Sequence, residues 1–313
     1  MLGKTAGGLF WMYRYLERAE NTARLADAGF RIALTRSDHA EDEWASIIDT
    51  ASARKAFVDA GGKFDGPSVI NFLLRDPANR SSVISVTEAA RNNARLVRTA
   101  LTREVWEAVN ETWITLKAAL ARPVRETDLP DVLTLIRNQS SLVRGATIGT
   151  MLRNDIYNFA RMGTFIERSD NIARILDVKY YVLLPSVQLV GSTLDNVQWE
   201  TILRAASAER SFRWLYGGET RPVTIADFLI LDRRMPRSLL YCTRKLAGNL
   251  GHLCADYGVR RPSLDFALGL RDELEELTID SIMERGLHEF LTKFIQSNNA
   301  LAAHVEEDFR FNR

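Results

Sequence analysis

The stretch from Tyr15 to Asp27 reads YLERAENTARLAD, and the stretch from Phe165 to Asp177, FIERSDNIARILD, repeats it 150 residues later. Both contain the pattern Glu-x-x-x-Asn-x-Ala-Arg, which occurs once more from Glu88 to Arg95. At average residue usage four fixed letters match by chance on the order of once in 10^5 windows. Three copies in one chain therefore indicate an internal repeat, which determines the architecture and is interpreted first.

A second pair of matching segments lies downstream of the first and third copies. The segments FLLRD and FLILD each end in an aspartate that stands six residues before a serine, Ser82 in one half and Ser238 in the other. The offset has grown to 156, which one small insertion explains. The sequence therefore predicts a single domain over residues 1–313, built from tandem pseudo-repeats at about 8–145 and 150–313.

Composition places the chain among ordinary globular proteins, with 46% hydrophobic and 26% charged residues. Because 41 Lys+Arg balance 40 Asp+Glu, the charge indicates neither nucleic acid nor an acidic membrane as a partner. The longest apolar run stops at Pro185, far short of a bilayer span, and we see no signal peptide. Two cysteines, Cys242 and Cys254, make no disulfide framework. We therefore expect a reduced, cytoplasmic protein.

The secondary-structure pattern is helical throughout. Proline is scarce and separates long segments of Ala, Leu, Arg and Glu, which are strong helix formers. The segments 49–60 and 195–216 each end at a pair of glycines, a helix C-cap signal. Residues 82–120 contain neither Gly nor Pro, which predicts one helix of about ten turns or two helices in line. We predict an all-α protein, a large helical bundle of ten to fourteen helices.

The repeated motif forms a polar stripe when residues 12–30 are wound as a helix, and an apolar arc borders the stripe on each side. Glu17 and Asn21 are four residues apart, as are Glu20 and Arg24, so these groups can pair along the stripe. A plain solvated face would not be bordered by apolar residues on both sides. We therefore expect four charged residues of the first and third copies to be mostly buried and paired: Glu17, Arg24, Glu167 and Arg174.

The middle copy differs in charge. It keeps Glu88, Asn92 and Arg95 but has Arg91 and Arg98 where the first copy has acidic residues. This inversion suggests that the middle helix lies against one of the acidic copies.

The motif has two interpretations. It either fixes helix register through a buried network, since arginine forks suit carboxylates and amides, or it forms a central polar cleft. In a cleft, arginines would bind a carboxylate or phosphate, while Glu17 and Glu167, the candidate acid or base residues, would receive an amine or a proton. A zwitterionic amino acid or a peptide end would suit that mixture. The candidate ligand-binding residues are Arg18, Asn21, Arg24, Arg95, Arg168, Asn171 and Arg174.

Other chemistry finds little support in the sequence. The Glu-x-x-His pattern of helical di-iron sites does not occur. His252-x-Cys254 with Cys242 lacks a fourth ligand and fits no zinc module. Neither a P-loop, nor a Gly-x-Gly-x-x-Gly loop, nor a Gly-x-Ser-x-Gly elbow is present. We therefore expect no metal and no cofactor.

The chain resembles the alpha-E family, a predicted all-helical family named for its Glu-Arg motif. The resemblance covers nearly the full length and rests on LFWMYRYLERAENTAR (9–24), NARLVR (93–98), GTMLR (149–153), ILDVKY (175–180) and MPRS (235–238). Members of the family are typically encoded beside, or fused to, ATP-grasp-type ligases and transglutaminase-like peptidases. The resemblance therefore implies a role in a system that makes or modifies peptides through amide bonds.

Three hypotheses follow. The leading one is a helical partner of an ATP-grasp-type ligase or a transglutaminase-like protein, which binds a peptide or the ligase through the Glu-Arg cleft. The second is an enzyme of peptide synthesis or modification, with Glu17 or Glu167 as acid or base and arginines as clamps. The third is a purely structural bundle. Two carboxylates in a concave pocket would favour the enzyme, whereas a dry, mutually satisfied network would favour the structural bundle.

Overall fold

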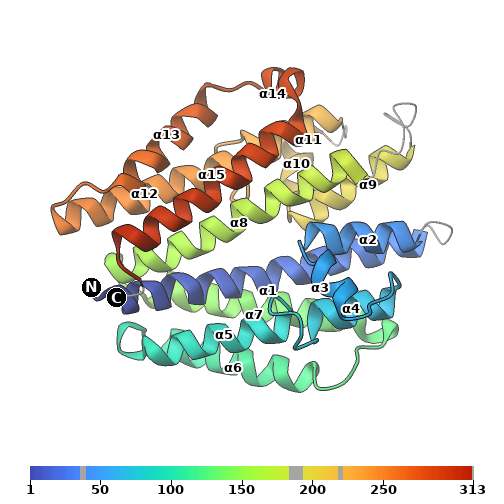
Figure 1. Cartoon of the computed structure of the whole chain (residues 1–313), viewed down its shortest axis with the longest axis horizontal. Helices are drawn as coiled ribbons and strands as arrows, with labels where there is room; N and C mark the ends of the chain where they lie inside the picture. Colours follow the sequence, from blue (N-terminus) through green and yellow to red (C-terminus); the bar gives the residue numbers. More distant parts are fainter. Residues whose placement is uncertain (36–39, 183–192, 218–220, 312–313) are drawn as a thin grey trace. The chain divides into compact units, whose positions relative to one another are not determined.

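The computed structural model describes residues 1–35, 40–182, 193–217 and 221–311 (Figure 1). In these ranges the chain forms fifteen α-helices and no strand, so the all-α prediction is confirmed. The helix count is slightly higher than the predicted ten to fourteen, because short helices follow one another where the sequence reads as one segment.

The helices up to the middle of the chain are α1 (Gly3–Thr35), α2 (Ala40–Thr50), α3 (Arg54–Asp59), α4 (Gly66–Leu74), α5 (Val83–Leu96), α6 (Arg103–Ala119) and α7 (Leu129–Thr150). The remainder are α8 (Asp155–Val182), α9 (Thr193–Ala205), α10 (Glu209–Tyr216), α11 (Pro222–Ile230), α12 (Leu239–Tyr257), α13 (Pro262–Glu276), α14 (Ile279–Arg285) and α15 (Leu287–Asp308). A long helix, three short ones and then longer helices occur twice in this order. The recurrence fits the predicted tandem repeat, although superposition of the halves stays a prediction.

The chain divides into two compact units, and the boundary falls within α8. Unit 1 comprises Met1–Glu167 with Phe309–Arg313, and unit 2 comprises Arg168–Asp308. In unit 1, α1 packs against α5 and α7, and α6 packs against the same two helices. The four run alongside one another and alternate in direction (Figure 1), which is the up-down-up-down arrangement of a four-helix bundle.

Two turns that follow helices have the same backbone geometry. Ser52 follows α2 and Ser207 follows α9, both with a left-handed backbone (φ 53° and 54°) and both within the sequence Ala-Ser-Ala. In each case the serine N–H donates to the carbonyl three residues back, and the next N–H donates to the carbonyl five residues back. This is the Schellman arrangement of helix C-termini. It splits the segments 49–60 and 195–216, which the sequence reads as continuous.

The Asp-to-Ser turns also match. Asp76 accepts a hydrogen bond from the backbone of Ala78, and Asp232 accepts one from the backbone of Arg234, two residues on in both turns. At the end of each turn the serine side chain, that of Ser82 or Ser238, accepts from the backbone N–H three residues later and so caps the next helix.

The region 82–120 forms two helices, as one alternative predicted, but they are not in line. Helix α5 ends at Leu96, and α6, capped by Thr102, returns beside it. Helix propensity alone could not place this reversal, because every residue of the turn is compatible with a helix. The middle helix does pack against α1, as its charge pattern suggested.

The core of unit 1 lies along α1. One apolar cluster joins the second half of α1 to α2, α4 and the adjoining ends of α5, α6 and α7. The other joins the first half of α1 to α5, α6, α7 and the start of α8. At Gly163, a Cβ atom would overlap the carbonyl oxygen of Phe10, so a glycine is required where α8 crosses α1.

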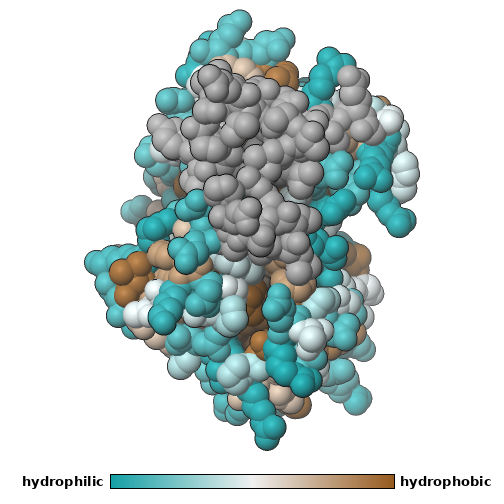
Figure 2. Space-filling view, turned by 90° about the vertical axis from the view of Figure 1, so that its right-hand side faces the viewer, coloured by the Kyte–Doolittle hydropathy of each residue, from teal (hydrophilic) through white to brown (hydrophobic). Residues whose placement is uncertain are grey.

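In unit 2, α13 packs against α12 and α15, and α14 packs against α11 and α15. Buried Ser169 of α8 donates to Asn298 of α15 at 2.9 Å. No helix in the described ranges has an apolar stretch long enough to cross a membrane. On the face drawn in Figure 2, hydrophobic side chains form small groups among hydrophilic ones.

Candidate functional site

The polar stripe of α1 lies between two buried arcs, as the periodicity predicted. Met12, Leu16 and Ala23 are buried on one side of the stripe, and Leu25 is buried on the other. Glu17 and Glu20 are themselves buried. A buried carboxylate needs cationic partners. The glutamates of the stripe are therefore expected to pair with arginines of α1 or of neighbouring helices.

The first group of charges surrounds Glu167 of α8. Arg18 donates from Nε to Oε1 at 2.5 Å and from Nη2 to Oε2 at 2.9 Å, while Arg14 donates from Nε to Oε2 at 3.1 Å. Desolvation by itself would raise the pKa of Glu167, but the two guanidinium groups outweigh it and hold the pKa below its ordinary value. Glu167 is thus a carboxylate stabilised in its charged form, and its ion pairs join α1 to α8.

The predicted ligand-binding role of Arg18 stays a prediction. From the helical wheel of α1 alone, Arg18 lies away from the core. In the structure Arg18 is paired with Glu167, so its replacement would break a partly buried ion pair.

The second group of charges surrounds Glu20, whose side chain is 1% exposed. Arg24 donates to Glu20 Oε1 from Nη2 at 2.6 Å and from Nε at 3.0 Å. Arg144 of α7 donates to the other oxygen, Oε2, through Nη2. Arg24 is thus paired as predicted, with Glu20 one turn earlier, and is partly rather than fully buried.

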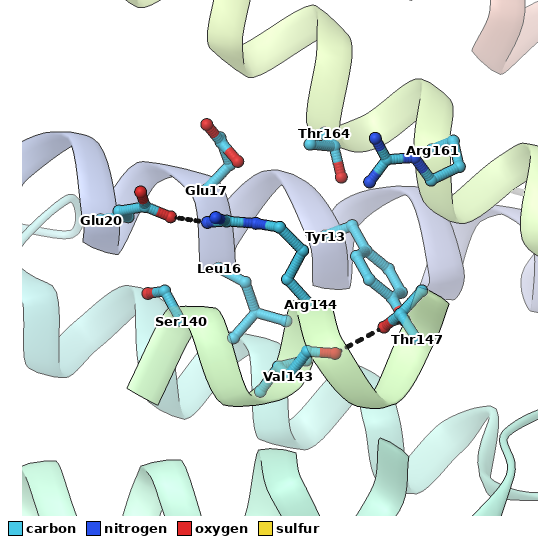
Figure 3. Close-up of a pocket in the computed structure, with 10 residues that line it drawn as sticks. All are labelled: Tyr13, Leu16, Glu17, Glu20, Ser140, Val143, Arg144, Thr147, Arg161 and Thr164. Carbon is cyan, nitrogen blue, oxygen red and sulfur yellow. Dashed lines mark hydrogen bonds and ion pairs between the residues drawn. The ribbon is translucent and has the colours of Figure 1, made fainter. Parts of the chain in front are cut away.

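A pocket opens where α1, α7 and the start of α8 meet (Figure 3). It encloses about 330 Å³ between atoms, including the part open to solvent. Its lining residues combine two carboxylates, two guanidinium groups and four hydroxyls with two aliphatic side chains: Tyr13, Leu16, Glu17, Glu20, Ser140, Val143, Arg144, Thr147, Arg161 and Thr164.

The hydroxyls on one wall are already ordered. Thr147 donates to the carbonyl of Val143 at 2.7 Å, so the Tyr13 hydroxyl, 2.6 Å from Thr147 Oγ1, donates to it. Burial raises the pKa of Tyr13 well above its ordinary value of 10.0. Tyr13 is therefore a fixed neutral donor and supplies no negative charge to the pocket.

The third copy of the motif, apart from Glu167, belongs to unit 2 and does not line this pocket. Arg168 is buried and donates to the carbonyl of Pro236 at 3.2 Å. Arg174 is partly buried and pairs with Asp170 one turn earlier, at 2.7 Å, as Arg24 pairs with Glu20. The side-chain nitrogen of Asn171 is buried without a hydrogen bond to any described residue.

The middle copy stays apart from both groups. Helix α5 contacts α1 through its buried alanines, and the motif letters Glu88, Asn92 and Arg95 point to solvent. Arg95 is therefore not brought together with the other candidate ligand-binding residues. Arg91, at the position of Glu20, instead donates to Asn110 of α6 at 2.9 Å.

Sequence reasoning missed Arg14, Arg144 and Arg161, because they lie outside the motif. One signal could have found Arg144. Glu20 and Asp27 are seven residues apart on α1, and Arg144 and Arg137 are seven residues apart on α7. The structure pairs Glu20 with Arg144 and Asp27 with Arg137, at 3.2 Å for the latter pair. Matching two-turn spacings of opposite charge are what two antiparallel helices in contact would show.

No group of three His, Cys, Asp or Glu side chains that could hold a metal ion occurs in the described part of the chain. Cys242 and Cys254 are both buried thiols.

The described helices form an all-α protein in which Glu-Arg ion pairs join neighbouring helices. The chain belongs to the Alpha-E family, described as a predicted alpha-helical domain with a conserved ER motif, which matches residues 1–309. Glu followed by Arg occurs in the first and third copies of the repeated motif, at Glu17-Arg18 and Glu167-Arg168.

Three curated relatives are uncharacterized proteins, one of Mycobacterium bovis and two of Mycobacterium tuberculosis strains. Each is 25% identical over 306 residues, which cover 88% of this chain and 33% of the relative. The chain therefore spans about a third of the length of the curated relatives it matches. No solved structure matches the chain.

Proposed function

We propose that this protein is a helical accessory module of an ATP-grasp-type peptide or amide ligase and that the pocket between α1, α7 and α8 binds part of the peptide. The pocket carries the proposal, because it brings both signs of charge and several hydroxyls to one small concave site. A peptide end offers the same mixture of charges and hydrogen-bonding groups. A transglutaminase-like protein is the other partner that the family resemblance suggests.

The length of the relatives supports a modular role. Two thirds of each mycobacterial relative lies outside the matched region, which leaves room for further domains in the same chain. A module that acts beside a ligase would either be fused to it or bind it as a separate chain.

The ion pairs favour binding over catalysis. A general acid or base should have a pKa near the working pH, whereas the two arginines lower that of Glu167. Glu20 is held by Arg24 and Arg144. Glu167 is therefore stabilised in the charged state and poorly suited to exchange a proton, and both oxygens of Glu20 are engaged by arginines.

An enzyme is the second candidate, because Glu17 and Glu20 both line the pocket. Of the two catalytic candidates from the sequence, only Glu17 reaches this site, so this alternative assigns proton transfer to Glu17. It predicts turnover of a peptide by the purified chain and loss of that turnover in Glu17→Gln. If the parent chain turns over no peptide in the presence or absence of ATP, the alternative is wrong.

The accessory role is tested by direct binding. The purified chain and the ATP-grasp-type ligase of the same host are titrated by isothermal calorimetry, with and without the peptide substrate of the ligase. We expect a saturable complex that tightens when the peptide is present. Heat indistinguishable from dilution in both titrations would contradict the partnership.

A further inference from the structure

We infer that the pocket between α1, α7 and α8 binds a carboxylate, such as the C-terminal carboxylate of a peptide, and that Arg144 is the residue that receives it. The inference rests on the proposed function, since it names the group that the same pocket recognises. It assigns recognition to an arginine outside the repeated motif.

The arginines that meet at Glu20 favour an anion beside them. The residues that line the pocket carry two positive and two negative charges, and Tyr13 adds no charge because burial raises its pKa. Arg24 and Arg144 both donate to the single buried carboxylate of Glu20, so two guanidinium groups share one negative charge. A bound anion beside Arg144 would balance the second guanidinium group.

Arg144 has unused donors. A guanidinium group has five N–H bonds and two edges that can each bind a carboxylate at two points. Glu20 takes a single hydrogen bond from Nη2. One complete edge therefore remains for a ligand. Because the Arg144 side chain is 32% exposed, a ligand can reach that edge from solvent.

The position of the Arg144 guanidinium group is fixed before a ligand binds. The buried carboxylate of Glu20 is fixed from the other side by Arg24, so it anchors one end of the Arg144 guanidinium. In Figure 3 the guanidinium lies across the pocket, with Ser140 of the same helix close to Glu20. Ser140 is buried and lines the pocket, so its hydroxyl can donate to a second ligand oxygen.

A carboxylate suits the site better than phosphate does. The carboxylate is planar, carries one charge and matches one edge of Arg144 with one hydroxyl beside it. A phosphate dianion would bring two negative charges close to Glu17 and Glu20, whereas the two arginines that share Glu20 leave one positive charge to balance.

The test uses three small probes and the 313-residue chain. N-acetylglycine presents a C-terminal carboxylate, N-acetylglycinamide has the same shape without the charge, and inorganic phosphate is the competing anion. Binding is measured by NMR chemical-shift titration at constant ionic strength. Arg144→Gln removes the receiving group, and Arg144→Lys keeps a charge without the two-point edge. Arg137→Gln, two turns earlier on α7 and paired with Asp27, is the matched control.

We expect saturable binding of N-acetylglycine, at least tenfold weaker in Arg144→Gln, intermediate in Arg144→Lys and within twofold of the parent in Arg137→Gln. Equal binding of the amide, tighter binding of phosphate, or parent-like binding by a folded Arg144→Gln would overturn the inference. If the probe fails but the ligase still binds, only the carboxylate assignment is wrong. If the probe binds Arg144 and no ligase associates, this inference stands without the proposed function.

Discussion

Arg18 and Glu167 form a two-point ion pair, with Nε 2.5 Å from Oε1 and Nη2 2.9 Å from Oε2. Arg18 comes from the first copy of the repeated motif and Glu167 from the third, although 149 residues separate them. The glutamate that opens the third copy is therefore neutralised by an arginine within the first copy. This pairing belongs to the structural interpretation of the motif, whereas the pocket beside it supports recognition.

Loss of the Glu167 charge should destabilise the fold. Glu167→Gln leaves the buried guanidinium group of Arg14 and the partly buried one of Arg18 without their counter-charge, so we expect the unfolding free energy to fall by about 3 kcal/mol. Arg18→Ala should also lower stability. Glu107→Gln removes the exposed pair with Arg103 and should leave stability unchanged within error. Urea denaturation measures all three, and equal midpoints for Glu167→Gln and Glu107→Gln would show that the buried pair contributes little.

The same carboxylate gives a pH dependence of known sign. The folded-state pKa of Glu167 lies below its ordinary value of 4.5, so the unfolded chain binds more protons in the window below about that value. The stabilising contribution is fully present above pH 4.5 and is lost as pH falls through the folded-state pKa. The stability gap between parent and Glu167→Gln should therefore be constant near neutrality and shrink on acidification. A gap that widens as pH falls would contradict the lowered pKa.

The crossing of α1 and α8 should tolerate no side chain at Gly163. Gly163→Ala places a Cβ against the carbonyl of Phe10, and the overlap should cost about 1–3 kcal/mol or more. Gly145→Ala, in the interior of α7 with nothing within 4 Å of the new Cβ, should instead stabilise the helix by about 0.5–1 kcal/mol. Thermal melts of the two variants should move in opposite directions. Parallel shifts would mean that α8 does not approach α1 this closely.

The left-handed serines test the repeat. Ser52 and Ser207 adopt a backbone conformation that costs an L-residue roughly 1–2 kcal/mol, so replacement of either serine by glycine should be neutral or stabilising. Replacement by valine should destabilise, because a β-branched side chain is strained there. Denaturation midpoints for both positions should change with the same sign. Opposite signs at Ser52 and Ser207 would argue against equivalent turns.

Much of the fold was predictable from local patterns. The glycine pairs predicted helix ends beside Gly61 and Gly217, where both glycines adopt a positive φ, and the apolar periodicity of α1 predicted which residues are buried. The reversal between α5 and α6 was not predictable, because helix propensity is a local property and carries no information about which helices pack together. Nor was the left-handed break at Ser52, because a non-glycine residue gives no local signal for positive φ.

The site was only partly predictable for the same reason. A helical wheel of one helix placed Arg18 away from the core, and only the position of α8 shows that this arc is covered. The middle copy kept its motif letters while they point to solvent, so identical letters do not imply an identical environment. Arg144 carries no motif, and its role follows only from the pocket that α7 shares with α1.

The most direct test of the central claim measures the rate of ADP release by the ATP-grasp-type ligase of the same host, with its peptide substrate and increasing amounts of this chain. If the pocket presents the peptide to the ligase, the parent chain and Arg137→Gln should accelerate ADP release, and folded Arg144→Gln should not. If the parent chain leaves the rate unchanged, or if Arg144→Gln accelerates it equally well, the pocket does not serve the ligase and the account is wrong.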